Sequence, residues 1–176
     1  MIGDPWTAKA HLESVRRDLA ENPRIVAGTH LYAALAALRA GDGDWAEDES
    51  RRARSAHGSA PVRAVAQAAL ARAHVLQRRA AEALECASEA KALLDGLGAI
   101  EENENVVHLA LPEALEACGR PAEALAHAEA ALNRLFSMMA KFRTPSRRAA
   151  FLHNHETHGA IVRLAHRLGL AVPALD

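Results

Sequence analysis

The sequence predicts an all-α protein, a right-handed α-α superhelix of about three antiparallel helix pairs. Three observations lead to this prediction. The chain is rich in alanine and leucine but only 3% aromatic, a composition that suits closely packed helices better than strands. Proline and glycine recur at the ends of these alanine-rich segments, where they start and stop helices. Small residues also recur at matched positions in successive segments, as stacked helix pairs require.

The residues that cap helix starts and those that end helices predict about nine helices. Asp4-Pro5 and Asn22-Pro23 each place a capping side chain before a proline at the first helical position. Asp44 and Glu47 have the spacing of a capping box. The expected helices are approximately Pro5–Ala20, Pro23–Gly41, Asp44–Gly58, Pro61–Gln77, Ala80–Asp95 with a stop at Gly96, Glu101–Cys118, Pro121–Phe142, a helix opened by Thr144-Pro145, and Thr157–Leu168 with a stop at Gly169.

Short connections between these helices make consecutive helices antiparallel neighbours in one domain, residues 1–176. An N-terminal helix precedes three repeats, at approximately 23–57, 60–95 and 101–142, and two capping helices follow at 145–169. No apolar run approaches the about 20 residues that span a bilayer, and the N-terminus has no signal-peptide pattern. We therefore expect a cytoplasmic protein that does not act in a membrane.

An internal repeat is the strongest signal in the sequence. The segments Ala80–Ala90 and Pro121–Ala131 place alanine at the same positions, and Gly41–Ala53 is a weaker third copy. Small residues at such positions let the backbones of two antiparallel helices approach closely. The copies align on three sets: Gly41, Ala46 and Ala53; Ala83 and Ala90; Gly119, Ala124 and Ala131.

This pattern, a glycine followed by alanines five and twelve residues later, resembles the tetratricopeptide repeat. In the middle copy Arg78 stands at the glycine position, so we expect that turn to be made differently. The alanine markers Ala46, Ala83 and Ala124 are 37 and 41 residues apart, more than the 34 residues of the standard repeat. We expect the extra residues to lengthen helices or the turns between repeats.

About the last eighty residues resemble the C-terminal tetratricopeptide region of large bacterial regulators, such as serine/threonine kinases and ATPase-type signalling regulators of myxobacteria. The resemblance is carried by Glu102–Gly119, Arg147–Leu152 and Ile161–Gly169. It implies protein–protein interaction or regulation of an attached catalytic domain. Pro112 departs from the pattern, and an interior proline predicts a kink near His108 or a helix that restarts at Pro112.

The resemblance implies a non-catalytic scaffold of a bacterial signalling system that binds a protein or peptide partner. In such arrays the first helix of each repeat lines a concave groove. An alternative is a transcriptional or signalling regulator whose groove senses a peptide or small ligand, and exposed apolar ends leave open a homodimer. The expected groove residues are Leu31, Leu35, Arg39, Val65, Arg72, Leu109 and Glu113.

Catalytic and cofactor motifs are not found, so we expect neither an enzyme nor a cofactor. The weak candidate for a metal site is His153, His155 and His158, whose spacing is not that of a metalloprotease. The alternative is a polar connection with exposed histidines, of which His155 and His158 share a helix face. Cys86 and Cys118 imply no disulfide framework, and we expect them in the core.

The charges of the chain are balanced, with 21 basic and 22 acidic residues and a net charge of −1. This balance argues against a nucleic-acid partner, which needs a net basic face. Arginines cluster at 51–54, 78–79 and 143–148. We expect them on solvated helix faces and helix ends; the alternative is an acidic partner or nucleic acid held across several repeats.

Overall fold

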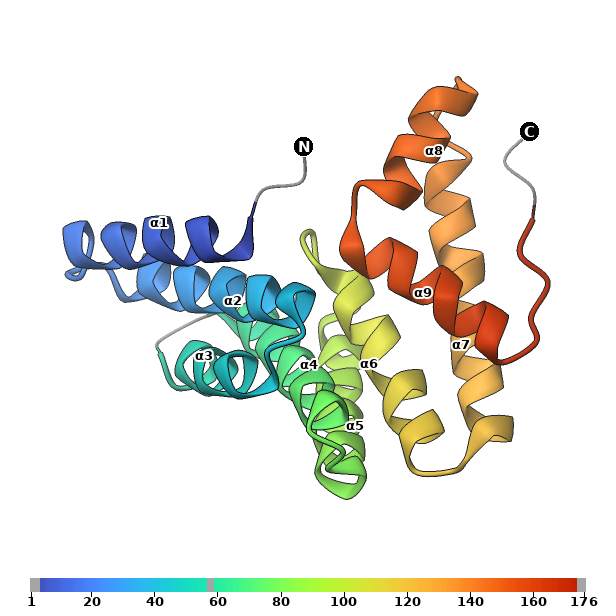
Figure 1. Cartoon of the computed structure of the whole chain (residues 1–176), viewed down its shortest axis with the longest axis horizontal. Coiled ribbons are helices and arrows are strands. Elements are labelled where there is room, and N and C mark those ends of the chain that lie inside the picture. Colours follow the sequence, from blue (N-terminus) through green and yellow to red (C-terminus); the bar gives the residue numbers. More distant parts are fainter. Residues whose placement is uncertain (1–3, 57–58, 174–176) are drawn as a thin grey trace.

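The computed structural model describes residues 4–56 and 59–173, within which nine helices form and no strand does (Figure 1). The helix stop expected at Gly58 lies outside the described residues. The helices are α1 (Pro5–Asp18), α2 (Pro23–Ala40), α3 (Gly43–Ser55), α4 (Ala60–Leu76), α5 (Ala80–Leu97), α6 (Glu104–Ala117), α7 (Pro121–Met139), α8 (Pro145–His153) and α9 (Glu156–Arg167).

Helix pairs stack along the molecule. The pairs α2–α3, α4–α5 and α6–α7 each pack together, and α2, α4 and α6 pack side by side as one inner row. Helix α9 continues this row because it packs on both α6 and α7. Helices α1 and α2 lie at one end of the array, and α7, α8 and α9 at the other (Figure 1). This arrangement is the helical-repeat superhelix that the sequence predicts.

The helix starts follow the capping side chains. The carboxylate of Asp4 accepts hydrogen bonds from the backbone of the first turn of α1, and Asn22 does the same for α2. Helix α3 differs from the prediction because its cap is Asp42, which accepts from the Trp45 amide at 2.9 Å. Asp44 instead accepts from the side chain of Gln77 at 2.7 Å, and so joins α3 to the end of α4.

The four helices of the inner row, α2, α4, α6 and α9, end in the same left-handed turn. The turn lies at Gly41, Arg78, Gly119 and Gly169, with φ between 61° and 79°. In each turn the amide of this residue bonds to the carbonyl three residues earlier, and the next amide bonds to the carbonyl five earlier. The turn at Arg78 is therefore made in the same way, and the expectation of a different turn is wrong. The turn after α9 also marks that helix as the equivalent of a first repeat helix.

Several helix boundaries differ from the predictions. Helix α5 runs through Gly96 and ends at Gly98, whose φ of 77° is left-handed. Helix α6 begins at Glu104 instead of 101, so residues 98–103 form a longer connection. It then continues through Pro112 as one helix, and the predicted restart there is wrong. The predicted kink near His108 stays a prediction.

The small residues of the repeat lie in the core. The alanines aligned above are at most 2% exposed, which places the helix backbones close together. One core cluster is centred on α4 and α5, and a second is centred on α7 and α9. Among the helices of the described residues, none has both the length and the apolar character of a bilayer-crossing segment.

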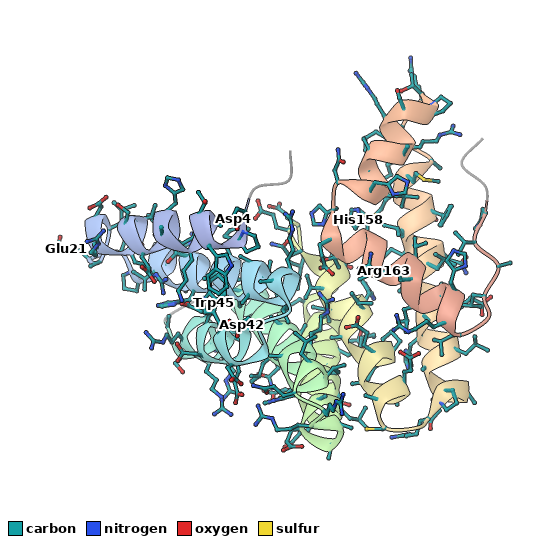
Figure 2. All side chains as sticks on the ribbon, viewed as in Figure 1. Asp4, Glu21, Asp42, Trp45, His158 and Arg163 are labelled. Carbon is teal, nitrogen blue, oxygen red and sulfur yellow. The ribbon has the colours of Figure 1, made fainter. Side chains whose placement is uncertain are left out.

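Helix α1 has no buried residue, although Leu12 packs at the edge of a core cluster, and side chains near both of its ends contact α3. Near its start, Trp6 stacks on Trp45 of α3, with ring centroids 5.4 Å apart and planes 13° from parallel (Figure 2). Near its end, Arg16 pairs with Glu49 of α3 at 3.0 Å, and His30 of α2 contacts the same carboxylate at 2.6 Å. Polar and aromatic contacts, more than apolar burial, therefore hold this helix.

Candidate functional site

A pocket of about 260 Å³ includes two of the expected groove residues. Leu35 and Arg39 of α2 line it together with Pro5 and Ala8 of α1. Residues 154–157, which are the connection after α8 and the first two residues of α9, also line it. We call this the Leu35 pocket. It lies where the two ends of the array face each other, so a ligand in it contacts both ends.

Two further groove residues are joined in an ion-pair network. Arg72 of α4 is 8% exposed, and its Nε donates to Glu113 of α6 at 2.8 Å. Its terminal nitrogens reach Glu156 of α9 at 3.4 and 3.5 Å. Burial disfavours the charge of Arg72, but the two carboxylates outweigh burial and raise its pKa. The donors of Arg72 are thus engaged within the protein, where they tie three helices of the inner row together.

The remaining groove residues lie in the core or at its edge. Leu31 and Val65 are buried and line a pocket of about 440 Å³ between α2, the start of α4 and residues 99–103. Leu109 is 0% exposed because it belongs to the core cluster formed with side chains of α7, α8 and α9. Leu109 therefore has no surface to offer a partner.

A third pocket, of about 460 Å³, lies between both ends of the inner row. We call it the Asn105 pocket. It is lined by Tyr32 of α2, the segment 100–106, Arg134 and Met138 of α7, Phe151 of α8, and His155, Thr157 and His158 at the start of α9. Five parts of the chain that are distant in sequence meet around this space.

A chain of hydrogen bonds fixes the side chain of Asn105. The Nδ1 of His158 lies 2.8 Å from the Phe151 carbonyl, which can only accept, so Nδ1 carries the proton. Nε2 of His158 must then accept, and Nδ2 of Asn105 donates to it at 3.0 Å. This orients the amide and leaves Oδ1 of Asn105 buried without a hydrogen-bond partner. Burial lowers the pKa of His158, as does His155, although the bond to Phe151 opposes the shift.

The acidic side chains of this pocket differ in their surroundings. Burial raises the pKa of Glu104, but bonds from the Ile100 amide and His108, together with the charge of Arg134, outweigh it and leave the pKa lowered. The Glu104 carboxylate lies 2.7 Å from Arg134. Glu102 is exposed and accepts from the Tyr32 hydroxyl at 2.8 Å, a bond that raises the pKa of the phenol.

The three histidines considered for a metal site do not converge. His155 and His158 stack with ring centroids 4.3 Å apart, as their shared helix face predicts. His158 uses both ring nitrogens in hydrogen bonds, and exposed His153 lines a separate pocket with Arg163. In residues 4–56 and 59–173, no group of three or more His, Cys, Asp or Glu could hold a metal ion. The weak metal candidate therefore gains no support from these positions and stays a prediction.

Comparison with known proteins bears on the architecture. No family model and no curated protein matches the chain. The crystal structure of a TPR-like protein from Chlorobium tepidum superposes with a TM-score of 0.58 over 81% of this chain and 94% of that chain, at 23% sequence identity. The fold is tetratricopeptide-like. This confirms the predicted all-α superhelix, whereas the likeness to the C-terminal region of bacterial kinases stays a prediction.

Within the TPR-like fold, two of the arginine clusters lie on solvated helix faces, as expected. Arg51 and Arg52 are exposed and pair with Glu47 and Asp48 one turn earlier on α3. Arg79 also pairs with Glu47. The cluster at 143–148 lies at the connection between α7 and α8, where Arg148 donates to the Phe142 carbonyl at 3.0 Å.

Both cysteines are half-buried free thiols at the edge of the TPR-like core. Sγ of Cys118 donates to the Ala80 carbonyl at 3.1 Å, and so links the end of α6 to the start of α5. Burial raises the pKa of Cys86, which keeps that thiol protonated and unreactive at neutral pH.

The sequence did not point to Asn105, Tyr32 or Glu102. Asn105 meets His158 across 53 residues, and Tyr32 meets Glu102 across 70. The spacing of residues along the sequence does not predict such contacts, because they depend on how the helix pairs stack. The histidine cluster did draw attention to His158, although for metal chemistry and not for its bond to Asn105.

Proposed function

We propose that the chain, acting as one domain, is a non-catalytic protein-interaction module of a cytoplasmic bacterial signalling system. The partner binds the concave side of the inner row, at the Leu35 pocket. One observation supports this most directly: Leu35 and Arg39 line one pocket with the turn before α9. Arginine is enriched among the residues that contribute most to binding in protein interfaces, and Arg39 is exposed at this pocket.

The test is affinity capture with the chain as bait, followed by titration of the purified captured protein. The double variant Leu35→Ala/Arg39→Glu should bind at least about tenfold more weakly, since loss of an interface centre typically has this effect. Arg72 is unsuited to this test, because it is buried and its loss would leave two carboxylates without their partner.

The control is Leu76→Ala/Arg63→Glu, which changes the same residue types on exposed positions of α4. It should bind like the original chain. Full affinity in the Leu35/Arg39 variant, or an equal loss in the control, would contradict binding at this pocket. Gel filtration of the same samples tests the predicted homodimer.

The Asn105 pocket supports a second candidate function, a regulator domain that senses a peptide or small ligand. Its volume of about 460 Å³ falls in the range of ligand sites, and five parts of the chain line it. A ligand there would raise the melting temperature by binding the folded state alone, which a thermal-shift screen measures. Partner binding that is unaffected by any such ligand would favour the scaffold over the sensor.

A further inference from the structure

We propose that the Asn105 pocket binds a guanidinium group, supplied either by a small molecule or by an arginine side chain of a peptide. The site adjoins the Leu35 pocket and shares Asn103, His155 and Thr157 with it, but neither Leu35 nor Arg39 lines the Asn105 pocket. The inference deepens the second function proposed above, because it names the ligand chemistry. It does not depend on partner binding at Leu35 and Arg39.

The first argument is an unused hydrogen-bond acceptor. His158 and Phe151 hold the amide of Asn105 so that Nδ2 is bonded and Oδ1 has no partner, although Asn105 lines the pocket. Asn105 is only 7% exposed, and its Oδ1 is almost fully buried. A buried acceptor without a partner is unfavourable, and an N–H donor from a ligand would remove this cost. The ligand should therefore carry N–H groups.

The second argument is the charge of the lining. Arg134 is paired with Glu104, so the two charges largely cancel. Glu101 and Glu102, both exposed, are then the uncompensated charges among the described lining residues. Glu102 accepts one bond from the Tyr32 hydroxyl, which brings no positive charge to the carboxylate. The field in the pocket therefore favours a cation and opposes an anion.

The third argument is the shape and polarity of the walls. Tyr32 is 47% exposed and, with half-buried Phe151, gives the pocket two aromatic side chains. A planar guanidinium stacks on aromatic faces and is less strongly hydrated than an ammonium. Its several donors, held in one plane, can reach an amide oxygen and a carboxylate together. These features together favour a guanidinium over a lysine-type ammonium.

Calorimetric titration of the full chain tests the proposal with two pairs of probes. Agmatine represents a small guanidinium compound, and carbamoylputrescine is its counterpart with an uncharged urea in place of the guanidinium. The blocked peptide Gly-Gly-Arg-Gly-Gly represents a peptide source, with citrulline replacing arginine in its counterpart. At least about tenfold tighter binding of one guanidinium probe than of its counterpart supports the site and names the source. Equal binding within both pairs, or no binding, overturns the proposal.

Variants locate the binding within the molecule. Asn105→Leu removes the acceptor and should weaken the guanidinium probe about tenfold, and Glu102→Gln should weaken it about threefold through the lost charge. Glu82→Gln, on an exposed position of α5, changes the net charge equally and should bind unchanged. Glu102 is exposed, so its variant tests the site even if Asn105→Leu disturbs folding. Unchanged affinity in Glu102→Gln and Asn105→Leu, or an equal loss in Glu82→Gln, would overturn the site. The Leu35/Arg39 variant should bind the probes normally, which separates this test from that of the proposed scaffold.

Discussion

Arg72 and Glu113 form a buried ion pair, with Nε of the arginine 2.8 Å from the carboxylate. The two residues lie 41 positions apart on α4 and α6, and Glu156 of α9 adds a second carboxylate to the same arginine. The network therefore crosses three consecutive helices of the inner row. It holds α9 on the array even though the inserted helix α8 separates α9 from the third repeat in sequence.

Replacing Arg72 by alanine should lower the free energy of unfolding by about 3 kcal/mol, because both carboxylates lose their buried partner. The double variant Arg72→Met/Glu113→Leu should cost clearly less than the sum of its single changes, since it removes charge and partner together. Urea unfolding of the four proteins gives this coupling. Arg63→Ala, exposed on the same helix, should change stability by less than about 0.5 kcal/mol. Additive effects of the two changes would show that the pair does not interact.

Arg78→Gly should stabilise the protein by about 0.5–1 kcal/mol. Arg78 adopts a φ of 61°, a conformation that costs an L residue free energy and glycine much less. Thermal and urea unfolding measure the gain. Gly41→Ala and Gly119→Ala, at the equivalent turns, should each destabilise by about 1 kcal/mol. An added Cβ at either glycine meets no atom within 4 Å, so this loss would reflect backbone conformation alone.

The acid stability of the chain should depend on Glu49. Burial raises the pKa of this carboxyl, but the bond from His30 and the charge of Arg16 outweigh burial, so the pKa lies below 4.5 in the folded protein. Such a carboxylate stabilises the fold above the pKa of the unfolded chain, and the contribution is lost as the pH falls through the folded value. Glu49→Gln should therefore show a smaller loss of stability between about pH 5 and pH 3 than the original chain.

The comparison for Glu49 is Glu129→Gln, at an exposed position of α7. Denaturant unfolding at several pH values should give the original slope in this control. A Glu49→Gln protein with the original acid dependence would mean that another group holds α1 against acid. Hydrogen exchange in α1 would then show whether the helix separates at all.

His158 should titrate below its ordinary pKa of 6.5, because burial and His155 both disfavour its charged form. NMR should also find the proton of the neutral ring on Nδ1, as the bond to the Phe151 carbonyl requires. Because His158 binds a proton less readily in the folded chain than in the unfolded chain, the free energy of unfolding should fall as the pH drops from about 6.5 toward the pKa of His158 in the folded chain. A midpoint at or above 6.5, or a proton on Nε2, would remove the orientation derived for Asn105.

Most of the fold could be predicted from local sequence features. The alanines of the repeat and the glycine turns mark helix contacts and helix ends that depend on few neighbours, so the sequence could predict the helix pairs. The prediction failed at Arg78. Because arginine rarely adopts a positive φ, a different turn was expected there, but the surrounding helices impose the same left-handed turn as at the glycines. The predicted start of α3 at Asp44 was also wrong, because Asp42, an equally suitable capping residue two positions earlier, caps the helix.

The candidate site was less predictable, because its residues depend on how distant helices meet. Periodicity placed Leu35 and Leu109 on the same kind of face, yet only Leu35 lines a pocket. The difference arises because Leu109 packs in a core cluster with α7, α8 and α9, and the contacts that place these helices, such as Arg72 with Glu156, are distant in sequence. Asn105 could not be found for the same reason.

Both tryptophans of the chain, Trp6 and Trp45, meet in a single stacked contact between α1 and α3. Intrinsic tryptophan fluorescence therefore reports on the contact between α1 and α3, whereas circular dichroism reports on all of the helices. In a repeat array each unit depends mainly on its neighbours, and α1 buries none of its residues. The fluorescence transition should thus come at lower denaturant than the dichroism transition, and a melting curve recorded by fluorescence would describe the departure of α1 while the array is still folded.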